Sequence, residues 1–160
     1  MNKAFLGIGT NLGDREKNLR DSIVKIEKHI GWVVKSSSVY ETAPWGVDAE
    51  NDFLNMVTEI ETCHSPDEIM KQILMIESML GRERNQDRYS SRVIDIDILF
   101  FDDLVLNEKG LKIPHRLIHE RKFVLVPFNE IAPDFIHPVL AKSMKVLLDE
   151  CRDRSKISKL

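Results

Sequence analysis

The run of residues 93–101 constrains the fold more than any other stretch, because two aspartates interrupt an otherwise apolar sequence. Side chains in a β-strand alternate between its two faces. The pattern therefore predicts a strand with one fully apolar face, formed by Ile94, Ile96, Ile98 and Phe100. The opposite face carries both carboxylates among the remaining apolar residues, namely Val93, Asp95, Asp97, Leu99 and Phe101.

Asp95 and Asp97 are expected to lie about 7 Å apart, so in a partly desolvated site their charges repel each other unless a cation lies between them. Carboxylate oxygens are the ligands that Mg²⁺ prefers. The alternative is an acidic strand face turned to solvent, which is the commoner case for an isolated Asp-x-Asp. The preceding residues 81–92 contain four arginines, and arginine binds phosphate oxygens well, so the neighbourhood favours a site for a metal and a polyphosphate.

Composition limits the other functions that this chain could have. A chain of 160 residues predicts one domain, spanning residues 1–160, and a net charge of -3 argues against a broad basic surface for nucleic acid. Cys63 and Cys151 lack ligand-like spacing, and no apolar stretch is long enough to cross a membrane. We therefore expect a cytoplasmic protein with neither a nucleic-acid nor a membrane partner, and a frayed polar tail at residues 151–160. We also expect a monomer, although these features do not indicate the oligomeric state.

The order of the expected elements predicts an α+β fold. Strands are expected at residues 3–9, 32–42, 53–62 and 93–101, and helices at 14–30 and 65–80. Ser65 and Glu68 form a capping box at the start of the second helix, and short helices are expected at 121–131 and 143–150. This order is typical of a ferredoxin-like sandwich, an antiparallel sheet with helices on one face and the other face available for a site or further helices.

Four blocks in the same order resemble the 6-hydroxymethyl-7,8-dihydropterin pyrophosphokinase family. They are residues 7–14, residues 40–44 with 53–55, the arginine-rich loop with the aspartate strand at 82–99, and residues 113–127. The resemblance covers nearly the whole chain. It implies transfer of pyrophosphate from MgATP to the hydroxymethyl group of the pterin, giving the pterin diphosphate and AMP in folate biosynthesis.

The resemblance also implies roles for individual residues. Asp95 and Asp97 would bind two Mg²⁺ ions, and Arg82 and Arg92 would hold the polyphosphate, so these four are the expected catalytic residues. The expected ATP-binding residues are Glu77, Arg84, Ile98, Lys112, His115, Arg116 and Arg121. The expected pterin-binding residues are Thr42, Ala43, Pro44, Trp45, Phe53, Asn55, Tyr89 and Phe123.

Two other functions remain open at this point, namely a different Mg²⁺-dependent nucleotidyl or phosphoryl transferase and an RNA-binding or regulatory domain. His115 and His119 are four residues apart, but without a third ligand we expect hydrogen bonding instead of zinc. Gly7 and Gly9 lack the third glycine of a dinucleotide fingerprint, so we interpret them as a turn between strand and helix.

Overall fold

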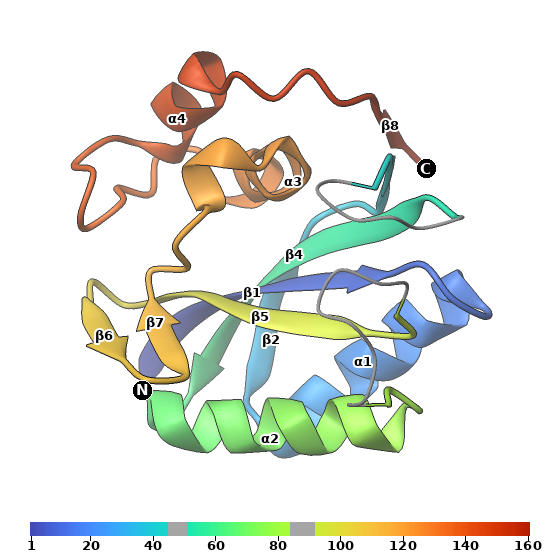
Figure 1. The fold of residues 1–160 in the computed structure, drawn as a ribbon. Helices are drawn as coiled ribbons and strands as arrows, with labels where there is room; N and C mark the ends of the chain where they lie inside the picture. Colours follow the sequence, from blue (N-terminus) through green and yellow to red (C-terminus); the bar gives the residue numbers. More distant parts are fainter. Residues whose placement is uncertain (45–50, 84–91) are drawn as a thin grey trace.

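The computed structural model describes residues 1–44, 51–83 and 92–160, and its centre is a six-stranded sheet (Figure 1). The order across the sheet is β5 (Asp95–Phe101), β1 (Asn2–Thr10), β4 (Phe53–Thr62), β3 (Tyr40–Thr42) and β8 (Ile157–Lys159). The sixth strand, β2 (Trp32–Ser36), also pairs with β4. All these pairings are antiparallel, as the sequence predicts, and β6 (Leu106–Glu108) with β7 (Leu111–Ile113) forms a separate two-stranded sheet.

Helices cover both faces of the sheet (Figure 1). α1 (Arg15–His29) and α2 (Pro66–Met79) lie on one face, and the expected capping box of Ser65 and Glu68 is confirmed at the start of α2. The opposite face carries α3 (Lys122–Ile131) and α4 (Met144–Glu150), preceded by the short helix η1 (Ile118–Glu120). The α+β prediction is confirmed. Among the described residues, no helix is both long and apolar enough to span a membrane.

Each layer of helices packs on its own hydrophobic core. Isoleucines and leucines dominate the core under α1 and α2, as shown by Leu6, Ile26 and Ile73, which are almost fully buried. The core under α3 and α4 is aromatic, and the rings of Phe5 and Phe128 lie 4.5 Å apart between their centroids. Burial of such side chains stabilises the fold by about 2 kcal/mol each, so both helix layers are held firmly on the sheet.

The expected single strand at 32–42 is wrong, because it is two strands, β2 and β3, separated at Ser37. The Ser37 N–H donates to Val57 O at 2.9 Å, and the Ser37 hydroxyl accepts from Val57 N at 3.0 Å. The side chain thus replaces one main-chain bond of the ladder, which interrupts the strand while keeping both halves on β4.

A β-bulge changes the alternation at the end of β5. Phe5 pairs with Phe100 and Leu6 pairs with Ile98, so Leu99 has no partner in the register. The extra residue turns Phe100 toward Phe5 in the aromatic core under α3 and α4. Phe101 instead packs in the core under α1 and α2. The sequence expectation therefore holds from Ile94 to Leu99 and is wrong for Phe100 and Phe101.

The expectation of a frayed tail is also wrong for the last residues, since residues 157–159 form β8 on the edge of β3. From Cys151 to Ile157, odd-numbered residues are half-buried and even-numbered residues are exposed, which is the alternation of an extended chain. β8 pairs with main-chain groups of β3, which would otherwise be an open edge of the sheet.

Candidate active site

The floor of the site is a stretch of sheet in which two glycines of β1 lie between polar residues of β5 and β4. Across β1 and β5, Gly7 pairs with Asp97 and Gly9 pairs with Asp95. On the other side of β1, Gly9 pairs with Asn55 of β4. Because paired residues in an antiparallel sheet point to the same face, the carboxylates and the Asn55 amide open into one cavity of about 280 Å³.

Gly7 and Gly9 keep the middle of this floor clear. A Cβ atom at Gly9 would lie 2.7 Å from Asn55 Oδ1, and one at Gly7 would lie 3.3 Å from Leu99 Cδ2. The interpretation of these glycines as a turn is wrong, since both lie inside β1. Sequence reasoning missed them as residues of the site, although their spacing of two matches that of Asp95 and Asp97.

Arginines and carboxylates form a network at one end of the cavity. Asp95 accepts hydrogen bonds from Arg82 Nη1 at 3.0 Å and from Arg92 Nη1 at 3.1 Å. Arg82 Nη1 also donates to Glu77 Oε2 at 2.6 Å, and that oxygen accepts from Ile96 N at 2.9 Å. Burial would lower the pKa of Arg82, but the carboxylates of Glu77 and Asp95 outweigh it and raise the pKa. Both arginines are therefore ion-paired with Asp95.

Asp97 lies in a different electrostatic environment from Asp95. Burial, followed by the charges of Asp95 and Glu77, raises the pKa of Asp97 to about 8, although the charges of Arg121 and Arg92 act in the opposite direction. Two adjacent carboxylates that repel each other fit a divalent cation, since their oxygens are hard ligands. The described residues contain no group of three or more potential metal ligands, so a Mg²⁺ ion here would take further oxygens from water and phosphates, as Mg²⁺ commonly does.

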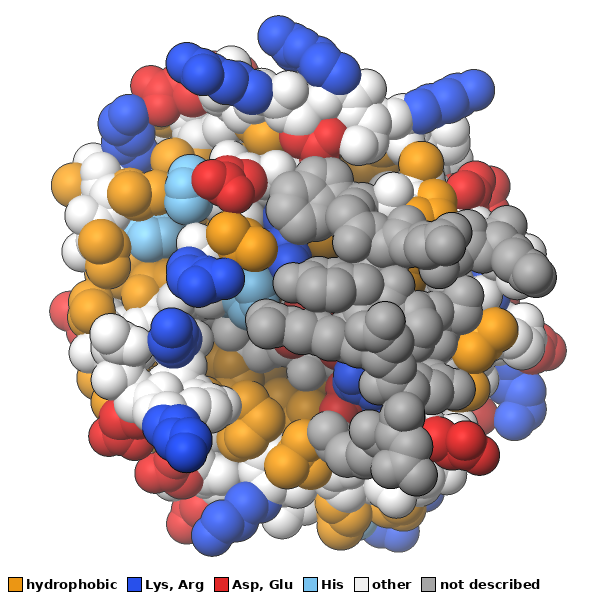
Figure 2. Space-filling view, in the orientation of Figure 1, with side chains coloured by type: hydrophobic (Ala, Val, Ile, Leu, Met, Phe, Trp, Pro, Cys, Tyr) orange, Lys and Arg blue, Asp and Glu red, His pale blue; other side chains and the backbone are white. Residues whose placement is uncertain are grey.

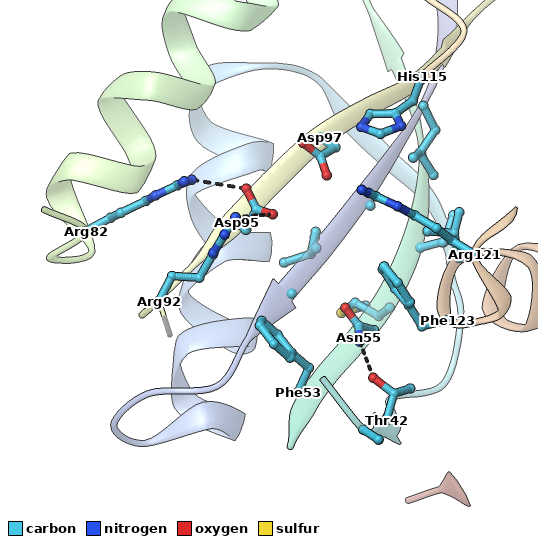
Figure 3. A pocket seen from close by; sticks show the side chains of 18 residues that line it. Thr42, Phe53, Asn55, Arg82, Arg92, Asp95, Asp97, His115, Arg121 and Phe123 are labelled. Carbon is cyan, nitrogen blue, oxygen red and sulfur yellow. Dashed lines mark hydrogen bonds and ion pairs between the residues drawn. The ribbon is translucent and has the colours of Figure 1, made fainter. Parts of the chain in front are cut away.

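Aromatic rings and an oriented amide line the other end of the cavity. Asn55 Nδ2 donates to Thr42 Oγ1 at 2.8 Å, and both side chains are buried. This bond fixes which face of the amide points into the cavity. Figure 3 shows Phe53 and Phe123 on either side of Asn55, and Arg121 Cζ lies 5.6 Å from the centroid of the Phe123 ring. These groups suit a flat molecule with amide-like edges.

His115 lines the cavity and is held by hydrogen bonds to the main chain. Its N–H donates to Leu99 O at 3.0 Å, and its Nδ1 accepts from Leu117 N at 3.3 Å. Because Nδ1 is an acceptor, the proton of the neutral ring lies on Nε2. The expected hydrogen-bonding role of His115 is thus confirmed.

The structure brings most of the predicted residues into this one cavity. The predicted residues that line it are Thr42, Ala43, Phe53, Asn55, Arg82, Arg92, Asp95, Asp97, His115, Arg121 and Phe123. The lining also includes residues that sequence reasoning missed, namely Gly7, Ile8, Gly9, Met56, Val57, Leu99 and Val124.

The remaining predicted residues lie elsewhere. Glu77 is behind the lining and holds Arg82, while the Ile98 side chain is buried in the core under α1 and α2. Pro44, Lys112 and Arg116 are not part of the described lining, and the last two are exposed. The predictions for Trp45, Arg84 and Tyr89 concern residues outside the described part of the chain.

Figure 2 shows the outer surface in the orientation of Figure 1. On this face, the described Lys and Arg side chains are spread among acidic and apolar ones. This mixture is unlike the broad basic, aromatic-rich surface that an RNA-binding sheet needs. The cavity instead joins two carboxylates, three arginines and an aromatic slot, an arrangement typical of enzymes that transfer phosphoryl groups from a metal-bound nucleotide.

Comparison with known proteins identifies the family within that class. The model of the 7,8-dihydro-6-hydroxymethylpterin-pyrophosphokinase (HPPK) family matches residues 5–133, and the chain belongs to this family. A 2-amino-4-hydroxy-6-hydroxymethyldihydropteridine pyrophosphokinase of Aquifex aeolicus is 37% identical over 145 residues, which cover 91% of this chain and 89% of that protein. The enzyme of the same name from Bacillus subtilis is 40% identical over 131 residues, covering 81% of this chain and 78% of that protein.

Solved structures support the fold. A Plasmodium falciparum HPPK-DHPS structure has a TM-score of 0.76 at 21% identity, and the match covers 93% of this chain. The same match covers 44% of the Plasmodium chain. The sheet and helices described above are therefore those of an HPPK unit.

Proposed function

We infer that this chain is a pyrophosphokinase of folate biosynthesis, which transfers the pyrophosphoryl group of ATP to 6-hydroxymethyl-7,8-dihydropterin. One observation carries the assignment of both substrates to the same cavity. The pairings of Gly9 with Asp95 and with Asn55 bring a charged end and an aromatic, amide-bearing end onto one open floor. The charged end suits the triphosphate, and the other end suits the pterin ring.

The nucleotide binds at the end that carries Asp95 and Asp97. These carboxylates would hold two Mg²⁺ ions, which would supply positive charge for the phosphate oxygens and increase the acidity of the attacking hydroxyl group. Arg82 and Arg92, held beside Asp95, add fixed positive charge where the phosphates lie. Residues 112–121 lead from β7 to the start of α3 and extend this basic side with Lys112, His115, Arg116 and Arg121.

The pterin binds at the opposite end. Its ring lies between Phe53 and Phe123, and its amide edge bonds with Asn55, whose orientation Thr42 fixes. The two substrates then meet above Gly7 and Gly9, where no side chain of the described residues separates them. This arrangement lowers the barrier mainly by holding both reactants in position.

In the reaction, the hydroxymethyl oxygen forms a bond with the β-phosphorus, and the bond from that phosphorus to the oxygen of the α-phosphate breaks. The hydroxyl proton passes to solvent, and AMP leaves with the bridging oxygen. Negative charge grows on the leaving oxygen and on the moving group, and Arg82 and Arg92 stabilise this charge.

Product analysis tests the proposal against the alternative of another phosphoryl or nucleotidyl transferase. The protein is incubated with ATP, Mg²⁺ and the reduced pterin, and products are separated by anion-exchange chromatography. We expect AMP and pterin diphosphate in equal amounts, and no turnover with Asp97→Asn. Formation of ADP, or release of pyrophosphate without pterin diphosphate, would contradict the proposal.

A further inference from the structure

The last ten residues connect two walls of the cavity. After α4, the chain runs past α3 in an extended conformation and joins the sheet as β8, next to β3 (Figure 1). We call residues 153–160 the C-terminal strap. α3 begins beside Phe123, and β3 carries Thr42, so the strap contacts an element on each side of the pterin end.

At its first contact, the strap caps α3. The Lys122 N–H donates to Asp153 Oδ2 at 3.1 Å. The residue at the N-cap position of α3, Arg121, makes no side-chain capping bond. Helix starts leave main-chain N–H groups without intrahelical partners, and a carboxylate is a favourable acceptor there. Asp153 therefore fixes the main chain between Arg121 and Phe123, two residues that line the cavity.

Asp153 is itself held in place. Its Oδ1 accepts from Ser155 N at 2.9 Å and from the Ser155 hydroxyl, and Lys122 Nζ donates to Ser155 O at 3.5 Å. Burial alone would raise the pKa of Asp153, but the hydrogen bonds from Ser155 and Lys122 keep this pKa below its usual value. The capping carboxylate is therefore both ionised and oriented at neutral pH.

At its second contact, the strap pairs with β3. Ile157 lies opposite Thr42, Ser158 opposite Glu41, and Leu160 N donates to Val39 O at 2.9 Å. Hydrogen-bonded pairs alternate along an antiparallel ladder, so Ser158 is the next residue whose N–H faces β3. β8 thus supports the short strand whose Thr42 orients the Asn55 amide.

We propose that the C-terminal strap positions the two walls of the pterin subsite, with Asp153 and Ser158 as the positioning residues. This inference rests on the proposed function and deepens it. Asp153 fixes the first turn of α3, which carries Phe123. The main chain of Ser158 holds β3, which carries Thr42. Neither residue lines the cavity, so their effect on the substrate passes through Phe123 and Thr42.

The test compares Michaelis constants for the pterin and for ATP in two variants of the strap. Asp153→Ala removes the cap of α3, and Ser158→Pro removes the N–H that faces β3. Each should raise the KM for the pterin by about fivefold, the change expected from losing one cap or ladder bond of ordinary strength. The KM for ATP and kcat should stay within about twofold. Asp153→Asn keeps one acceptor oxygen and should recover part of the affinity.

Matched controls separate positioning from general loss of stability. Ser143 Oγ accepts from Val146 N at 3.2 Å and caps α4, which does not line the cavity. Ser143→Ala should therefore lower the unfolding temperature as much as Asp153→Ala does, without changing the KM for the pterin. Ser158→Ala keeps the main-chain N–H and should behave like the wild type.

Two outcomes would contradict the proposed role of the strap. One is a KM for the pterin that stays at the wild-type value in Asp153→Ala, and the other is an equal rise of the KM for ATP. The KM for the pterin in Asp153→Ala tests the proposed role of the strap even if Ser158→Pro does not fold. If the wild-type protein forms no AMP, the proposed function is wrong. If the wild type is active and the strap variants keep its KM for the pterin, only the proposed role of the strap is wrong.

Discussion

Substituting Gly9 by alanine tests whether the glycine floor joins the two ends of the cavity. The added Cβ would lie 2.7 Å from Asn55 Oδ1, and ordinary contacts begin at about 3.5 Å. The Asn55 amide must therefore move, which breaks its 2.8 Å bond to Thr42. Losing that bond costs about 1 kcal/mol, and the crowding costs at least about 1 kcal/mol more. Together they correspond to a rise of about 30-fold in the KM for the pterin.

Steady-state kinetics with the pterin varied at saturating ATP measure this change, and thermal unfolding shows that the variant is folded. Gly7→Ala is the matched control, because its Cβ would lie 3.3 Å from the end of the flexible Leu99 side chain. Its effect on the KM for the pterin should be several times smaller. A folded Gly9→Ala variant with the wild-type KM, or equal effects of the two substitutions, would refute the reasoning.

Three further predictions concern charge. Asp97→Ala should lower turnover at least about a thousandfold in single-turnover assays, without lowering the unfolding temperature, because it removes a carboxylate that Asp95 repels. Arg92→Ala should reduce the rate of the chemical step more than the affinity for ATP, measured by rapid quench and calorimetry; the reverse ranking would contradict a role in the transition state. Burial, with the neighbouring Glu130 carboxylate, raises the pKa of Tyr40 from 10.0 to about 12. The folded state then binds more protons than the unfolded state in this range, so the free energy of unfolding should fall as pH rises from 10 to 12. Tyr40→Phe should flatten that slope in urea titrations, and an unchanged slope would exclude Tyr40 as its source.

Local patterns in the sequence predicted most elements of the fold. The alternation around Asp95 and Asp97 and the capping box at Ser65 depend on residues close together in the chain, so both could be read without a structure. The bulge at Leu99 could not, because it depends on the register with β1. The β8 strand was missed for a similar reason, since it forms only where β3 offers a free edge.

The candidate site was predictable as a set of residues but not as an arrangement. Strand alternation and the nearby arginines indicated the charged part of the site, family resemblance added Asn55, and the structure brings these residues together in one cavity. The function of Gly7 and Gly9 in the floor follows only from their cross-strand partners, which lie far away in the sequence. Likewise, nothing near Lys122 in the sequence indicates that Asp153 caps α3.

Calorimetry tests the central claim most directly, namely that one cavity holds a Mg²⁺-bound nucleotide on Asp95 and Asp97 and the pterin beside it. A nonhydrolysable ATP analogue is titrated into wild type and Asp97→Asn, with and without Mg²⁺, and the pterin is then added. We predict that Mg²⁺ strengthens nucleotide binding at least about tenfold in the wild type only, and that the pterin binds to the nucleotide complex without displacing the analogue. Equal nucleotide affinity with and without Mg²⁺, or competition between the analogue and the pterin, would contradict the claim.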